Sequence, residues 1–171
     1  MAQTNEPLLS VKGLKQYFPV SKKFTVRAVD NISFDIYPGE TYGLVGESGS
    51  GKSTTGRSII RLYDPTEGTI LFNGEDISKK LTAKQEKMLR SDMQMVFQDP
   101  MASLNPHKKI LDTIAMGLDA HHPHMDQNER VERVSKMMEM VGLNPAYMNR
   151  YPNQFSGGQR QRIGIARALA V

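Results

Sequence analysis

Cysteine is absent from this 171-residue sequence, and its absence excludes three kinds of chemistry. The chain has no disulfide scaffold, no thiol nucleophile and no zinc site with cysteine ligands. Long apolar runs are missing too. The sequence contains no stretch of about eighteen apolar residues, the length that a membrane-spanning helix needs. Residues 1–7 also lack the apolar core of a signal peptide. We therefore expect a soluble, cytosolic chain that contacts a membrane only through a partner.

The net charge is also small. The 22 lysines and arginines exceed the 18 aspartates and glutamates, which leaves a formal net charge of +4. This excess suits a phosphate ligand or an anionic membrane surface but requires neither. The length allows one domain with a real core, or one domain with a small appendage, and is tight for two. Composition alone therefore leaves the function open.

The clearest motif is a glycine-rich segment that matches the P-loop pattern G-x-x-x-x-G-K-[ST] at every required position. Its glycines let the backbone turn tightly, so that successive N–H groups point at phosphate oxygens. Lys52 would bring a mobile positive charge to the β and γ phosphates, and the Ser53 hydroxyl would bind Mg²⁺. The candidate nucleotide-binding residues are Gly46, Glu47, Ser48, Gly49, Ser50, Gly51, Lys52, Ser53 and Thr54.

The flanking residues support nucleotide binding. Residues 40–46 predict a short buried strand and residues 53–62 a helix, whose dipole would direct its positive end at the phosphates. The alternative is a chance glycine- and serine-rich linker. A linker has no reason to lie between an apolar strand and a helix, so we favour the P-loop.

The rest of the N-terminal part favours strands. Period-two alternation or β-type composition occurs at residues 8–14, 24–28, 32–36 and 68–72. Asn73 and Gly74 then form a dipeptide typical of a two-residue hairpin turn. We expect a strand-rich layer around one strand–helix unit.

The pattern changes near Pro100. Before it, residues 83–90 predict a short charged helix and residues 93–97 a strand. After it, two segments have helical periodicity, and Gly142 is placed to cap the second. These segments are residues 110–118 and 128–141, and the second carries Val131, Val134, Met138 and Val141 on one face. We expect a helical insertion between about residues 100 and 151.

Three neighbouring histidines suggest a metal site. His121, His122 and His124 lie in a polar, proline-containing connection, with no carboxylate or cysteine at a fixed ligand spacing. We therefore favour an ordinary connection between helices over metal binding.

A second glycine motif lies near the end of the sequence. Ser156 is well placed as the N-cap of a helix that begins with Gly157 and Gly158. Two glycines at a helix start expose backbone N–H groups to an anion, so this segment is chemically a second phosphate site. Taken alone it is equally a capped helix with a flexible start, but together with the P-loop it is more specific.

The two motifs, with a glutamine-ending strand and a helical stretch between them, resemble the nucleotide-binding subunits of ABC transporters. The resemblance runs from about Leu8 to the last residue. It implies an α/β fold: a P-loop NTPase (ABC ATPase) core with an N-terminal antiparallel β layer and a helical subdomain. Within a single domain it implies the β layer and core over about residues 1–99, the helical subdomain over 100–155 and the signature helix over 156–171.

The resemblance also implies roles for individual residues. Phe18, with Tyr17 as second choice, falls where the family stacks an aromatic ring on adenine. Gln98 matches the family's Q-loop glutamine, which reaches Mg²⁺ and the attacking water, although alone it could be a surface residue at a strand end. The signature would act in trans on ATP bound to the opposite subunit. The implied signature residues are Ser156, Gly157, Gly158 and Gln159, the implied catalytic residues Lys52, Gln98, Ser156 and Gly158, and the implied Mg²⁺ ligands Ser53 and Gln98.

The sequences of three segments resemble those of the ATPase subunits of bacterial oligopeptide and dipeptide importers. These segments are residues 43–54, 97–106 and 151–162, and Phe155 replaces the leucine usual before Ser-Gly-Gly-Gln. The resemblance implies ATP and Mg²⁺ as cofactors and ATP hydrolysis that energises peptide uptake. It implies as partners a second ABC ATPase subunit, identical or different, and transmembrane permease subunits, with an extracellular substrate-binding protein acting indirectly. The subunit would sit at the cytoplasmic face of the membrane.

Two alternatives remain. A soluble ABC ATPase acting on nucleic acid or ribosomes would use Arg160, Arg162 and Arg167, but aromatic residues for base stacking are not interleaved with them, so we expect no nucleic-acid partner. A non-catalytic nucleotide-binding fragment is the other. The family continues into an apolar strand with a Walker B aspartate and a catalytic glutamate, whereas this sequence ends at Val171. We therefore expect a truncated reading frame or partial sequence that alone hydrolyses little ATP.

Overall fold

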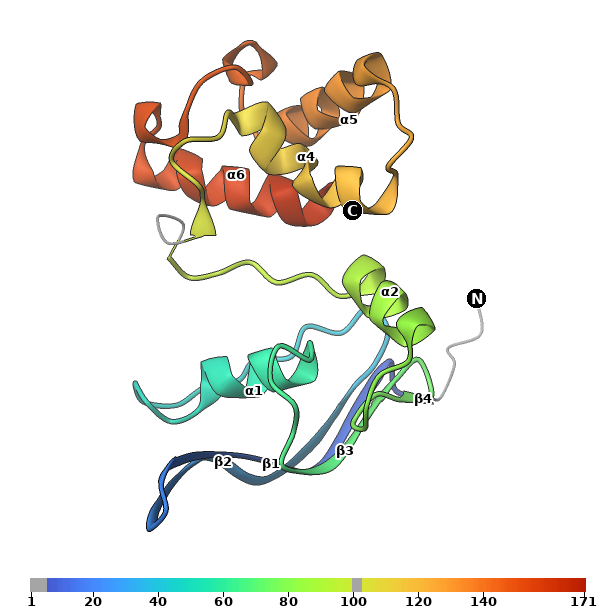
Figure 1. Cartoon of the computed structure of the whole chain (residues 1–171), viewed down its shortest axis with the longest axis vertical. Coiled ribbons are helices and arrows are strands. Elements are labelled where there is room, and N and C mark those ends of the chain that lie inside the picture. The colour runs from blue at the N-terminus through green and yellow to red at the C-terminus, as the bar shows by residue number, and fades with distance from the viewer. Residues whose placement is uncertain (1–5, 100–102) are drawn as a thin grey trace. The chain divides into compact units, whose positions relative to one another are not determined.

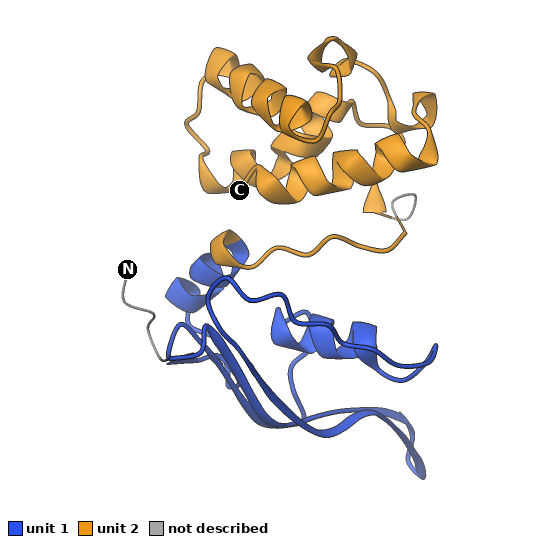
Figure 2. Ribbon diagram, turned by 180° about the vertical axis from the view of Figure 1, so that it is seen from behind, with its two compact units in different colours: residues 1–90 blue, residues 91–171 orange. Residues whose placement is uncertain are grey.

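The computed structural model of the chain describes residues 6–99 and 103–171. It divides into two compact units, one ending at Arg90 and the other running from Ser91 to Val171 (Figure 2). Pro100, where the sequence pattern changes, lies outside the described residues. So do residues 1–5 of the N-terminal segment. The subdivision predicted from the resemblance, with boundaries at residues 99/100 and 155/156, stays a prediction.

The first unit contains a four-stranded antiparallel sheet with the strand order β2-β1-β3-β4 (Figure 1). Its β3–β4 turn is the predicted one, with Asn73 and Gly74 at φ values of 50° and 78°, as a two-residue hairpin turn with two left-handed residues requires. The strands are β1 (Leu9–Ser21), β2 (Phe24–Ile36), β3 (Glu67–Phe72) and β4 (Glu75–Asp76).

Two of the predicted strands form one continuous strand. Residues 24–28 and 32–36 both belong to β2, and the residues between them form a bulge rather than a break. Asn31 has a φ of 58°, and the register against β1 shifts between the pairs Leu14–Ile32 and Gln16–Val29. A bulge absorbs an extra residue without ending the ladder, so the polar Asp30-Asn31 step did not terminate the strand.

Helix α1 (Lys52–Ile59) packs against β1 and β2 (Figure 1). Ser58, fully buried on this helix, donates a hydrogen bond of 3.2 Å to the side-chain oxygen of Gln16 in β1. This buried pair fixes the helix to β1, an interior strand of the sheet. Val11, Leu14 and Ile70 of the sheet are fully buried, and Leu89 of α2 (Ala83–Asp92) is 4% exposed.

The second unit is built on three mutually packed helices: α4 (Ile110–His121), α5 (Gln127–Met140) and α6 (Gly157–Leu169). Two short 3₁₀ helices, η1 (Pro145–Tyr147) and η2 (Pro152–Gln154), connect α5 to α6. The predicted apolar face of α5 is confirmed, since Val134 and Met138 are fully buried and Val131 and Val141 pack against the same core. Gly142 follows this helix with a φ of 71°, as its predicted capping role requires.

Two predicted strands are wrong. Residues 40–46 and 93–97 are neither strand nor helix, and Leu44 and Val45 of the first segment are 45% and 92% exposed. A strand exists only where a neighbouring strand supplies hydrogen-bond partners. Neither segment finds such a neighbour in the portion of the chain that the structure describes. The predicted helix over residues 53–62 also ends early, at Ile59.

Candidate nucleotide-binding site

The P-loop folds around the ammonium group of Lys52. The Nζ atom donates to the carbonyl oxygens of Gly46 at 2.8 Å and Glu47 at 2.5 Å, and it lies 3.3 Å from the hydroxyl of Ser50. These contacts hold the lysine side chain across the loop that precedes its own helix. The motif predicted from spacing is therefore a closed loop with its cation inside.

Two glycines of this loop leave little room for a Cβ. Gly51 is the N-cap of α1 with a φ of 89°, and a Cβ there would lie 2.2 Å from the carbonyl oxygen of Ala28 in β2. A Cβ at Gly46 would lie 2.6 Å from the Ser50 hydroxyl. The close approach to β2 requires that position 51 carry no Cβ, whereas the atom near Gly46 belongs to a side chain that can rotate. The start of α1 is thereby fixed against the sheet.

The residues at this helix start fit a phosphate with its metal ion. The first turn of α1 contains no acidic residue, so its N–H groups and dipole remain available to an anion. Ser53 is exposed in that turn, which leaves its hydroxyl accessible. Mg²⁺ is usually held by few protein oxygens together with phosphate oxygens and water, so a single serine hydroxyl suits it.

The two aromatic candidates are not equivalent. Phe18 lies edge-on to Tyr63, with ring centroids 5.2 Å apart and planes at 82°. Tyr17 instead donates its hydroxyl to Asp30 at 2.5 Å and lies under the guanidinium of Arg27. Successive side chains of a strand point to opposite faces, so only one of the two can face α1. Tyr63 hydrogen-bonds to Arg57 of α1, which assigns that face to Phe18.

The signature motif forms a reciprocal cap at the start of α6. The backbone N–H of Ser156 donates to the side-chain oxygen of Gln159 at 2.9 Å, and the N–H of Gln159 donates to the Ser156 hydroxyl at 3.3 Å. The predicted N-cap is confirmed. A Cβ at Gly157 or Gly158 would meet nothing within 4 Å, and neither residue has a positive φ. The fold therefore does not require glycine at these two positions.

Gln98 is exposed and lies in neither a helix nor a strand. It belongs to the second unit, as do Ser156 and its neighbours, whereas the P-loop and Phe18 belong to the first. Within the first unit, the structure brings the P-loop together with its helix. The signature cap belongs to the second unit. Tyr63 was missed from the sequence, and no local signal could have found it, because its contact with Phe18 joins distant parts of the chain.

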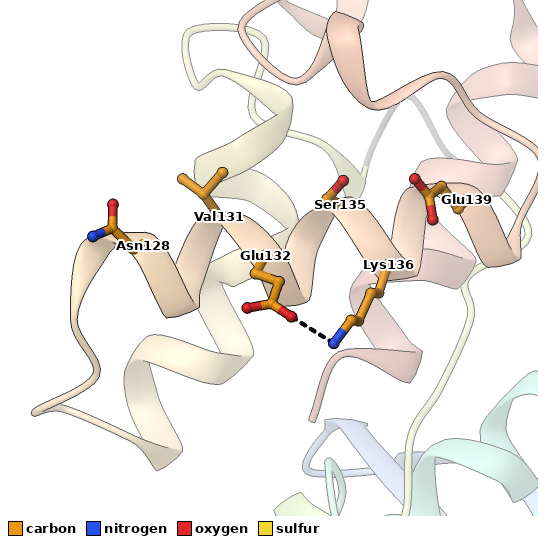
Figure 3. Close-up of a pocket in the computed structure, with 6 residues that line it drawn as sticks. All are labelled: Asn128, Val131, Glu132, Ser135, Lys136 and Glu139. Atoms are coloured by element: carbon orange, nitrogen blue, oxygen red, sulfur yellow. Dashed lines mark hydrogen bonds and ion pairs between the residues drawn. The ribbon is translucent and has the colours of Figure 1, made fainter.

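A depression of about 440 Å³ lies on the second unit (Figure 3). All its lining residues come from one face of α5, and Glu132 and Lys136 pair there at 2.7 Å. A helix face with paired opposite charges is typical of a solvated surface. The lining residues are Asn128, Val131, Glu132, Ser135, Lys136 and Glu139. Among the described residues, no group of three or more histidine, aspartate or glutamate side chains is arranged to hold a metal ion.

A P-loop at the start of a helix, beside an antiparallel layer, defines a P-loop nucleotide-binding protein of the α/β class. A model of the family described as "ABC transporter" matches residues 29–171. The chain therefore belongs to the ABC transporter family.

Curated relatives support the finer resemblance. The chain is 60% identical over 166 residues to the oligopeptide transport ATP-binding protein OppF of Bacillus subtilis (strain 168), covering 97% of this chain and 54% of the relative. It is 51% identical over 166 residues to the dipeptide transport ATP-binding protein DppF of Lactococcus lactis subsp. cremoris (strain MG1363), covering 96% and 53%. The chain thus spans about half the length of these relatives. The resemblance to peptide-importer ATPase subunits is confirmed.

A solved structure supports the fold. The ATP-binding cassette MJ0796, in a dimeric post-hydrolysis state bound to ADP and Pi, is 31% identical with a TM-score of 0.85, covering 95% of this chain and 69% of the other. The predicted fold class, an α/β ABC ATPase fold with an antiparallel layer and a helical part, is confirmed.

Proposed function

We propose that this chain is the ATP-binding portion of a subunit that hydrolyses ATP to energise peptide uptake through a membrane permease. The observation that carries the proposal is the loop closed around Lys52 at the start of α1. The names of the relatives, which are oligopeptide and dipeptide transport ATP-binding proteins, support the solute class.

In this proposal the loop N–H groups, the start of α1 and Lys52 together hold the triphosphate. Ser53, with Gln98, would hold Mg²⁺, which neutralises phosphate charge during transfer to water. Phe18 would stack on the adenine, since base–aromatic stacking is tolerant of small shifts in the base. Gln98 would also orient the attacking water.

The signature would complete the site from a second ABC subunit. Glycine near the start of a helix forgoes stability relative to alanine, and the fold does not demand it at residues 157 and 158. Open space above these residues suits close approach by a phosphate of the partner's nucleotide. This supports a role for Ser156, Gly157, Gly158 and Gln159 in trans.

The proposed partners are a second ABC subunit, identical or different, and permease subunits, with a substrate-binding protein acting indirectly. The proposed location is the cytoplasmic face of the membrane. None of the helices within residues 6–99 and 103–171 has the length and apolar character to span a bilayer. Phe155 belongs to one of the segments that resemble peptide importers. It is buried in the helical core near Tyr147, so its role is packing rather than contact with solute.

Two of the three arginines that suggested nucleic acid have other partners. Arg167 donates to the backbone oxygen of Ser103 at 2.6 Å, and burial lowers the pKa of its guanidinium. Arg162 donates to the backbone oxygen of Gly142 at 3.3 Å. Cations engaged with the chain's own carbonyl groups make a poor phosphate-tracking surface, which favours the transporter function.

The test is nucleotide affinity measured by calorimetry. Lys52→Ala should weaken binding of both ATP and inorganic triphosphate about tenfold or more, because a hydrogen bond to a charged group contributes about 1.5–3 kcal/mol. Lys84→Ala, on the exposed surface of α2, is the matched control and should bind normally. Unchanged affinity for Lys52→Ala would refute the site. For the solute, cells carrying only the Lys52→Ala protein should fail to take up labelled peptide.

A further inference from the structure

The contact between Phe18 and Tyr63 links the hairpin of β1 and β2 to the segment that follows α1. The two rings meet edge to face at a centroid distance of 5.2 Å, a favourable geometry for an aromatic pair. Both side chains are half-buried. Across the hairpin, Phe18 pairs with Val26, which is 39% exposed. Tyr63 is thus a packing partner that limits the orientations open to a partly solvated phenylalanine ring.

Tyr63 is itself fixed to the P-loop helix. Its backbone N–H donates to the carbonyl oxygen of Arg57 at 3.3 Å, and the Arg57 guanidinium donates to its hydroxyl at 3.4 Å. Arg57 lies in the last turn of α1. The same helix therefore carries Lys52 at its start and, through Arg57, the ring that meets Phe18 at its end.

We propose that Tyr63 is a positioning residue for the nucleoside part of the nucleotide. It holds the Phe18 ring in one orientation relative to α1, and so sets the base platform relative to the phosphate loop. The physical gain is preorganisation, because a ring already fixed loses less conformational freedom when a base stacks on it. The inference rests on the proposed function and deepens it by adding a residue that touches neither phosphate nor metal.

The experiment compares ATP with inorganic triphosphate, each with Mg²⁺, as ligands of the whole protein. Tyr63→Leu should weaken ATP binding about 2- to 10-fold, the range expected for losing one aromatic pair, and leave triphosphate binding unchanged. Tyr63→Phe, which keeps the ring, should retain most of the ATP affinity. Leu62→Ala, an exposed neighbour, is the matched control and should change neither affinity.

A double-mutant cycle tests whether Tyr63 acts through Phe18. In the Phe18→Ala background, Tyr63→Leu should have no further effect on ATP affinity, because coupled residues are not additive. Three results would overturn the proposal. They are additive losses of ATP affinity in the double variant, equal losses of ATP and triphosphate affinity in Tyr63→Leu, and no loss of ATP affinity in Tyr63→Leu. Failure of the proposed function is a different result: Lys52→Ala would then bind triphosphate as tightly as the parent protein.

Discussion

Arg130 of α5 binds Asp119 of α4 in a bidentate pair, with Nε 2.8 Å from Oδ1 and Nη2 2.9 Å from Oδ2. The same Nη2 lies 3.2 Å from Asp112. The arginine side chain is only 14% exposed, so one largely buried guanidinium joins two helices through two carboxylates. Planar bidentate pairs of this kind are more specific and stronger than single contacts.

We predict that Asp119→Asn destabilises the fold by about 1 kcal/mol. This is less than the roughly 1.5–3 kcal/mol typical of a hydrogen bond to a charged group, because the aspartate side chain is itself 47% exposed and is partly screened by solvent. Urea unfolding at neutral pH measures the loss. Glu132→Gln, which removes an exposed pair on α5, should leave the midpoint nearly unchanged. Equal effects of the two substitutions would contradict a special role for Asp119.

The pH dependence of this effect follows from the same pair. The hydrogen bond from Arg130 lowers the pKa of Asp119 below its usual value, so the unfolded chain binds the proton more readily. The stabilisation is therefore fully present above the ordinary aspartate pKa of about 3.9 and is lost as the pH falls through the lower folded-state pKa. The stability difference between the parent protein and Asp119→Asn should shrink in unfolding experiments at and below pH 3.

Substitution of Phe18 should change nucleotide selectivity, whereas substitution of Tyr17 should not. Phe18→Ala is expected to weaken ATP binding by about 1 to 3 kcal/mol, as for a lost stacking platform, and to leave triphosphate binding intact. Tyr17→Leu, on the other face of β1, should leave the ratio of the two affinities unchanged. Calorimetric titration with both ligands decides. The reverse pattern would assign the base to Tyr17.

Gly51→Ala should unfold the P-loop region. A φ of 89° is strained for any residue with a Cβ, by about 1–3 kcal/mol, and the added carbon would also lie 2.2 Å from the Ala28 carbonyl oxygen. Gly74→Ala is the matched control, since its φ is 78° but its Cβ would meet nothing within 4 Å. Thermal unfolding should show the larger loss for Gly51→Ala. Similar losses would mean that the close approach to β2 is not limiting.

Gly158→Ala should separate stability from turnover. The added methyl group has open space, and alanine favours a helix by up to about 1 kcal/mol over glycine, so the melting temperature should hold or rise. ATP turnover of the assembled transporter should nevertheless fall. Gly164→Ala on the same helix should leave turnover unchanged.

Ser156→Arg should abolish turnover while the isolated subunit still binds ATP. Parental turnover in Ser156→Arg would remove the signature from the mechanism.

Features fixed by a few neighbouring residues were predictable from the sequence. The closed P-loop, the Asn73-Gly74 turn, the buried face of α5 and the cap at Ser156 each depend on chemistry within about one or two turns of chain. In each case the residue types allow few other local structures. The sequence and the structure therefore agree there.

Features that depend on distant partners were not predictable. Residues 40–46 have the composition of a buried strand, but a strand needs a paired neighbour, which no local pattern reports. The Phe18–Tyr63 contact and the Gln16–Ser58 hydrogen bond join segments far apart in the sequence. The role of Gln98 and the action of the signature in trans stay predictions.

The bulge at Asn31 has a consequence for self-association. β2 forms one edge of the sheet within the described part of the chain, and it is 13 residues long. A long, regular edge offers a row of free backbone groups on which a foreign strand can add, which is a route to aggregation. The left-handed residue at position 31 interrupts that row, and Asp30 and Asp35 place charge on either side of it. The irregularity that left β2 intact as one strand thus also protects it from unwanted pairing.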